Sequence, residues 1–128
     1  THREKLEADI RELETCATRL LTQVGQWLDQ QPQIDILEVH RMIDAQLMDS
    51  IDRFVTARST LIHTYGLQPY VDVMSDFSIA ERNINRAWSA SADGYVDEVW
   101  LSLKRAHGKL ERVTQRLAEQ ARHGLHWQ

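Results

Sequence analysis

Apolar and small side chains recur along the second half of the chain at intervals that alternate between three and four residues. This spacing keeps one face of a helix turned toward a partner. Gly94 tolerates the left-handed conformation that ends a helix, so Asp93-Gly94 predicts a tight turn between two helices. The series before the turn is Tyr70, Val73, Phe77, Ala80, Ile84, Ala87 and Ser91, and the series after it is Val96, Val99, Leu103, Ala106, Leu110, Val113 and Leu117.

The same alternation predicts two earlier helices. Pro32 and Gly66 mark the breaks between the helices, and Asp35 followed by Glu38 is a capping-box pattern at the start of the second. The four predicted helices cover about residues 2–28, 35–65, 70–93 and 95–122. The third begins at Pro69 or Tyr70, although a second capping box offers Ser78 as an alternative start. The first helix buries Leu6, Ile10, Leu13, Ala17, Leu20, Val24 and Trp27, and the second Ile36, His40, Ile43, Leu47, Ser50, Phe54, Ala57 and Leu61.

Short connections force successive helices to run antiparallel. The expected fold is therefore all-α: a single antiparallel up-down-up-down four-helix bundle that occupies residues 1–128 as one domain. Regular three–four spacing favours shallow helix crossings of about 20°. Both termini would lie at one end, opposite the Asp93-Gly94 turn.

The amino-acid composition limits the kinds of partner that the chain is expected to bind. The chain has 128 residues, of which 42% are hydrophobic and 27% charged, with a net charge of −4. An acidic balance gives no general attraction to nucleic acid, and no apolar run approaches the ~20 residues of a membrane span. We expect no nucleic-acid partner and no membrane insertion within this chain. The single cysteine, Cys16, favours a cytoplasmic location, with an exported sensory domain as the alternative if the chain is a fragment.

Histidine–carboxylate pairs are the first candidates for a metal site. His40 and Asp44 stand one turn apart, as do His107 and Glu111. In parallel second and fourth helices these pairs would be offset by roughly 10 Å along the axis, at ~1.5 Å per residue, too far to share an ion. We therefore expect no metal and no cofactor. No role is assigned to His63, His123 or His126.

Catalytic motifs are also lacking. There is no glycine-rich phosphate loop and no Gly-x-Ser-x-Gly elbow, and Cys16 beside the first apolar series is expected to be a semi-buried thiol. Residues 106–110, Ala-His-Gly-Lys-Leu, resemble a histidine phosphotransfer helix in their context, the preceding Ala and the nearby Lys. Gly108 and Lys109 follow His107 directly, which departs from the order of residues in that family. The resemblance implies a phosphorylated His107.

Polar residues and tryptophans gather around the Asp93-Gly94 turn. They define a candidate interaction patch, with Arg86 bracing Asp93 on one helix face. Two interpretations stand: a recognition surface, or a hydrogen-bonded lock whose tryptophans fill the end of the core. The candidate residues are Arg86, Trp88, Asp93, Tyr95, Trp100 and Trp27.

Regular apolar series without catalytic residues favour a non-enzymatic helical interaction module that self-associates, most simply as a homodimer. The alternative is a ligand-sensing four-helix-bundle domain excised from a bacterial transmembrane receptor. A histidine phosphotransfer-like domain that acts through His107 is the third hypothesis.

Overall fold

The computed structural model describes residues 1–123, and every regular element in this range is helical. Two 3-10 segments, η1 and η2, precede the second α-helix. In chain order the elements are α1 (His2–Asp29), η1 (Gln31–Gln33), η2 (Ile36–Glu38), α2 (Val39–Gln46), α3 (Met48–Ala57), α4 (Thr60–Tyr65), α5 (Leu67–Asp93) and α6 (Val96–His123).

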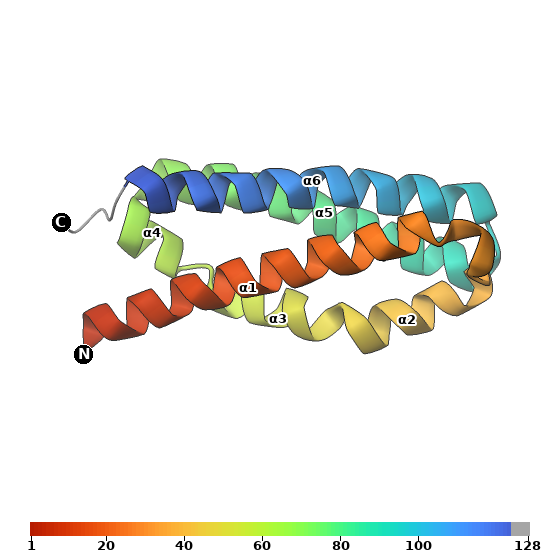
Figure 1. Ribbon diagram of the computed structural model, residues 1–128, viewed down its shortest axis with the longest axis horizontal. Helices are drawn as coiled ribbons and strands as arrows, with labels where there is room; N and C mark the ends of the chain where they lie inside the picture. Colours follow the sequence, from red (N-terminus) through yellow and green to blue (C-terminus); the bar gives the residue numbers. More distant parts are fainter. Residues whose placement is uncertain (124–128) are drawn as a thin grey trace.

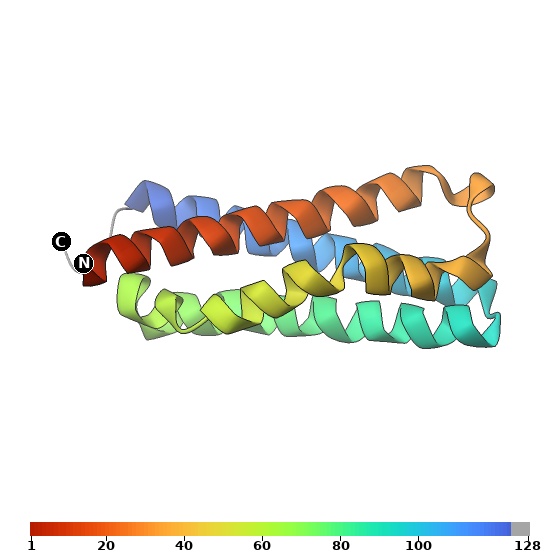
Figure 2. The ribbon, with the colours of Figure 1, turned by 90° about the horizontal axis from the view of Figure 1, so that it is seen from below.

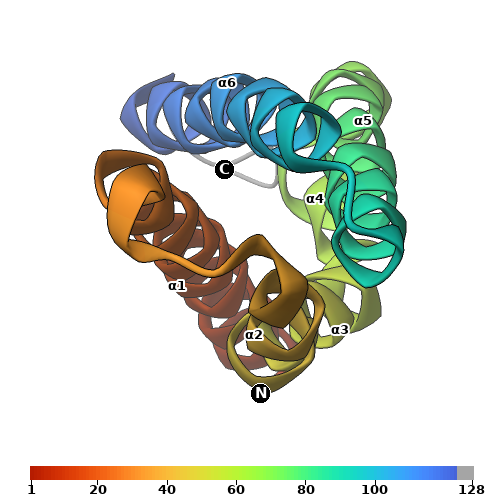
Figure 3. The ribbon, with the colours of Figure 1, turned by 90° about the vertical axis from the view of Figure 1, so that its right-hand side faces the viewer.

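The long helices α1, α5 and α6 lie along the long axis of the molecule, and α2 and α3 follow one another along the same direction (Figures 1 and 2). The short α4 slants away from this axis and leads from α3 to α5 (Figure 1). The start of α1 and the end of α6 lie at one end. The α5–α6 turn and the segment between α1 and α2 lie at the other, which we call the distal end. Viewed along this axis, α1, α2 with α3, α5 and α6 surround a common centre (Figure 3).

The second predicted helix requires correction, because residues 35–65 form three α-helices and a 3-10 segment rather than one helix. At its start, the Asp35 carboxylate accepts from the amide of Leu37 at 3.0 Å, which stabilises a tight turn. Glu38 does not complete a capping box but pairs with Arg41 at 3.2 Å. The α-helix therefore begins only at Val39.

Two interruptions divide the rest of this segment. The chain bends at Leu47, whose φ of −112° lies outside the ordinary helical range. After α3, the Arg58 guanidinium donates to the Val55 carbonyl at 2.6 Å, and the Leu61 amide bonds to the Arg58 carbonyl three residues back. The helix restarts at Thr60, whose hydroxyl donates to the Asp9 carboxylate of α1 at 3.0 Å.

Helix α5 starts at Leu67, earlier than the predicted Pro69 or Tyr70, and it has no second start at Ser78. Gly66, with φ 97°, turns the chain directly into the helix. Pro69 is accommodated because it lies in the first turn, where amide groups have no intrahelical partner. Helix α6 agrees with its predicted bounds to within one residue.

The predicted apolar series form the core. In α1, all seven of its members are buried, and Phe54 of α3 stacks on Phe77 of α5 with ring centres 4.0 Å apart. The clearest exception lies at the distal end, where Val96 at the start of α6 was predicted to be buried but is half exposed. Within residues 1–123, no helix combines the length and apolarity that crossing a membrane requires.

Candidate functional site

The Asp93-Gly94 turn is closed by backbone hydrogen bonds. Gly94 adopts φ 81°, the left-handed conformation, and its amide bonds to the Ser91 carbonyl at 3.2 Å. The Tyr95 amide bonds to the Ala90 carbonyl at 2.9 Å, which completes a Schellman motif. A Cβ at Gly94 would lie 3.7 Å from Leu37, so η2 packs directly beside the turn.

A buried serine joins this turn to the start of α2. The Ser91 hydroxyl donates to the Ile36 carbonyl and accepts from the His40 amide at 2.9 Å. The His40 Nδ1 lies 3.1 Å from the same oxygen. Because the hydroxyl donates to Ile36, its proton is not directed at His40 Nδ1, and Nδ1 is the donor of that contact in neutral His40. The cluster is a structural link, not a nucleophile–base pair.

Trp88 extends this link toward α2. Its indole Nε1 donates to the Asp44 carboxylate at 3.0 Å, and its ring meets His40 edge to face, with centres 5.4 Å apart. Trp88 remains partly accessible, since 37% of the residue is exposed. His40 and Asp44 therefore position Trp88.

The structure separates the six predicted patch residues. Trp27 is only 2% exposed and belongs to the core, and Trp100 packs partly buried against the core. Neither forms an open surface. Arg86 and Asp93 are exposed, but no ion pair joins them within residues 1–123, so the expected brace is absent there.

Three exposed apolar residues do lie close to the Asp93-Gly94 turn. Tyr95 is 65% exposed, Leu37 51% and Val96 50%. Leu37 adjoins Gly94, and the other two residues follow it directly, so we call Leu37, Tyr95 and Val96 the distal patch. Of these three residues, only Tyr95 was predicted from the sequence to belong to an interaction patch. Leu37 was detectable as an apolar residue outside the predicted apolar series, whereas Val96 was assigned to the core.

His107 lies between α6 and α1 and is about a third exposed. Its Nδ1 is 3.9 Å from Glu111, and its Nε2 would lie 3.2 Å from a Cβ at Gly25. The ring therefore occupies space that a glycine leaves on α1. This placement turns Nε2 toward the neighbouring helix, whereas a phosphate-accepting nitrogen must face solvent.

The cysteine and the other histidines do not come together in a shared site within residues 1–123. Cys16 is fully buried, and its burial, together with the charge of Glu12, raises the pKa of the thiol to about 11. His63 is exposed on α4, His123 lies 3.8 Å from Glu119, and His126 falls outside the described residues. No three His, Cys, Asp or Glu side chains in residues 1–123 gather as metal ligands.

The α5–α6 interface carries a charge cluster that the sequence analysis did not foresee. Asp76 is buried and accepts from Arg116 Nε at 2.7 Å, and Arg112 and Lys109 lie at 3.5 and 3.7 Å. Burial alone would raise the pKa of Asp76. The Arg116 hydrogen bond and the three positive charges together outweigh burial, so its pKa lies below the ordinary 3.8.

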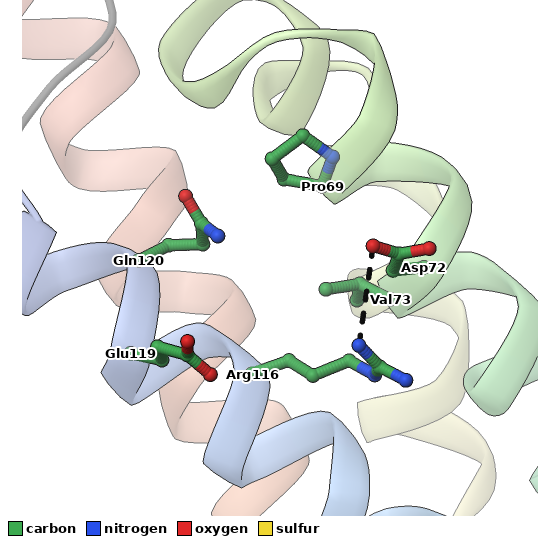
Figure 4. Close-up of a pocket in the computed structure, with 6 residues that line it drawn as sticks. All are labelled: Pro69, Asp72, Val73, Arg116, Glu119 and Gln120. Atoms are coloured by element: carbon green, nitrogen blue, oxygen red, sulfur yellow. Dashed lines mark ion pairs between the residues drawn. The ribbon is translucent and has the colours of Figure 1, made fainter.

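Two hollows flank this cluster. One, of about 120 Å³, opens between Pro69 and Gln120, where Arg116 also pairs with Asp72 at 3.9 Å (Figure 4). Glu119 lines the same hollow, so two carboxylates and one guanidinium face it and the lining carries no excess positive charge. The other is a groove of about 400 Å³ further along the α5–α6 interface, and its charged lining residues are all basic.

Comparison of the chain with protein-family models, curated proteins and solved structures finds no match. Function is therefore argued from the geometry above.

Proposed function

We propose that the protein is a non-enzymatic helical interaction module that self-associates through the distal patch. In this proposal the six helices act as an antiparallel bundle of four rods, with α2, α3 and α4 together forming one rod. Such a bundle presents its ends as compact surfaces for a partner. Trp88 and the Ser91 link support the patch from behind, because they fix α2 against α5.

The observation that carries the proposal is the exposure of Leu37, Tyr95 and Val96 around the Gly94 turn. Exposed apolar side chains that adjoin one another are typical of binding surfaces, and aromatic residues are enriched there. The rigid Gly94 turn holds Tyr95 and Val96 in place, so little conformational freedom is lost when they bind. A second copy supplies a matching apolar surface in a two-fold arrangement.

The charges around the patch predict how self-association depends on salt concentration. Asp93 and Asp97 are exposed beside the patch, so two copies that meet here bring like charges together. Salt screens such repulsion, with a Debye length of about 10 Å at 0.1 M. Association through the patch should therefore tighten as sodium chloride increases, opposite to the behaviour of a contact between unlike charges.

A phosphotransfer role for His107 is less consistent with the geometry, because Nε2 faces Gly25. Catalysis by Ser91 and His40 is similarly disfavoured by the hydrogen bond that Ser91 donates to Ile36. The interaction role requires neither group to react.

Sedimentation equilibrium tests the proposal. Wild type should show concentration-dependent dimers, and the double variant Tyr95→Ser/Val96→Ser should be monomeric with an unchanged helical circular dichroism spectrum. Leu67→Ser is the matched control, because Leu67 is as exposed as Tyr95 but lies at the opposite end of α5. The proposal fails if wild type stays monomeric, or if only the control variant loses the dimer.

A further inference from the structure

The groove of about 400 Å³ between α5 and α6 has the features of a ligand site that the interaction role does not use. Lys104, Arg105, Lys109 and Arg112 line it from α6. Its volume falls within the ~300–1,000 Å³ of small-molecule sites. The basic lining gives the groove a positive field, although the chain as a whole is acidic.

The positive charge is only partly neutralised. Asp76 is the carboxylate that pairs with Lys109 and Arg112, and Arg116 shares it as the closest partner. Lys104 and Arg105 are exposed and have no ion-pair partner within residues 1–123. An anion in the groove would therefore meet cations that the protein itself leaves available.

The floor of the groove adds a second, independent feature. Asn83 is buried, and its Nδ2 donates to the Ile79 carbonyl at 3.0 Å, which fixes the orientation of the amide. Its Oδ1 is then left buried without a hydrogen-bond partner. Buried polar atoms are nearly always paired, so this acceptor points to a donor that a ligand can bring.

The remaining lining gives the ligand its shape. Ile79 contributes apolar surface, and Gly108 leaves space that no other atom fills within 4 Å of a Cβ at that position. We propose that the groove binds an organic carboxylate with an apolar body and a hydroxyl group. The carboxylate pairs with Lys104 and Arg105, and the apolar body lies over Gly108 and Ile79. The hydroxyl donates to Asn83 Oδ1, which is covered in the ligand-free structure and becomes accessible as the ligand enters.

An NMR titration of the full chain tests this site, with 3-hydroxydecanoate as the probe and decanoate as its partner without the hydroxyl. We expect saturable shifts at the amides of Ile79, Asn83 and Gly108, and tighter binding of 3-hydroxydecanoate than of decanoate. Asn83→Ala should abolish that preference. Gly108→Leu should fill the groove and prevent saturation while the helix is retained, because leucine is a better helix former than glycine.

Charge is tested by Lys104→Gln/Arg105→Gln, which should weaken binding roughly three- to tenfold, as expected for two exposed ion pairs. Arg11→Gln/Arg122→Gln removes the same charge from exposed positions outside the groove and should leave the Kd unchanged. The proposal is overturned if the groove amides do not shift, if both double variants bind alike, or if the two probes bind equally.

Discussion

Asp76→Asn should destabilise the protein in a way that depends on pH. The substitution keeps the size of the buried side chain but removes the charge that faces Arg116, Arg112 and Lys109. Removing one partner of a fully buried ion pair costs about 3–5 kcal/mol. Here the three cations are each a third or more exposed, which lets solvent screen them, and asparagine still accepts one hydrogen bond. We therefore expect a loss of about 2 kcal/mol at pH 7.

That loss corresponds to a fall in Tm of roughly 8 °C for a chain of this length, at an unfolding entropy of ~2.1 cal/mol/K per residue. The direction in which this loss of stability changes with pH follows from the depressed pKa of Asp76. The stabilisation by the carboxylate is fully present above the ordinary unfolded-state pKa of 3.8, and it disappears as the pH falls through the lower folded-state pKa. Wild type and Asp76→Asn should therefore converge below pH 3.8.

Urea denaturation at a series of pH values from 7 to 3 measures this difference. Asp52→Asn is the matched control, since Asp52 is exposed and has no ion-pair partner within residues 1–123. Its stability should differ from wild type by less than about 0.5 kcal/mol at pH 7. The reasoning is refuted if Asp76→Asn costs no more than the control at neutral pH, or if its cost is the same at every pH.

Three further experiments test the packing. Ser91→Ala should cost about 2 kcal/mol in urea denaturation, because it removes the hydroxyl that links α2 to α5; a change under about 0.5 kcal/mol would contradict that role. Cys16 should react with a disulfide reagent at pH 8 only after unfolding, since burial raises its pKa to about 11; rapid labelling of folded protein would exclude this. Gly108→Ala should stabilise the protein by about 1 kcal/mol, whereas Gly25→Ala should gain less because its Cβ meets His107 at 3.2 Å; equal gains would show that the contact is unimportant.

Much of the fold could be predicted because the core follows the period of a helix. The apolar series that end at Trp27 and Leu117 are buried almost as expected. The interruptions at Leu47 and Arg58 were not predictable from the same spacing, which continues through both. One of them is coupled to a tertiary contact, since Thr60 donates to Asp9 of α1 at 3.0 Å. Residues distant in the chain therefore help determine where this segment restarts.

The candidate sites were predicted less completely. Tyr95 was identified from its position at the turn. Trp27 was assigned both to the buried apolar series and to the patch, and the structure agrees with the first assignment. The cluster around Asp76 did leave a signal, because Lys109, Arg112 and Arg116 recur at the helix period beside the apolar series of α6. Recognising it requires the relative register of α5 and α6, which the structure supplies.

Cysteine cross-linking tests the central proposal, self-association at the distal end, most directly. Ala92→Cys places an exposed thiol beside the distal patch without altering it, while the native Cys16 is buried. Under mild oxidation the Ala92→Cys variant should form disulfide dimers within minutes at concentrations where sedimentation detects association. Leu67→Cys, at the other end of α5, should remain monomeric. Dimers of Leu67→Cys that form as fast as those of Ala92→Cys, or none from Ala92→Cys, would contradict the proposal.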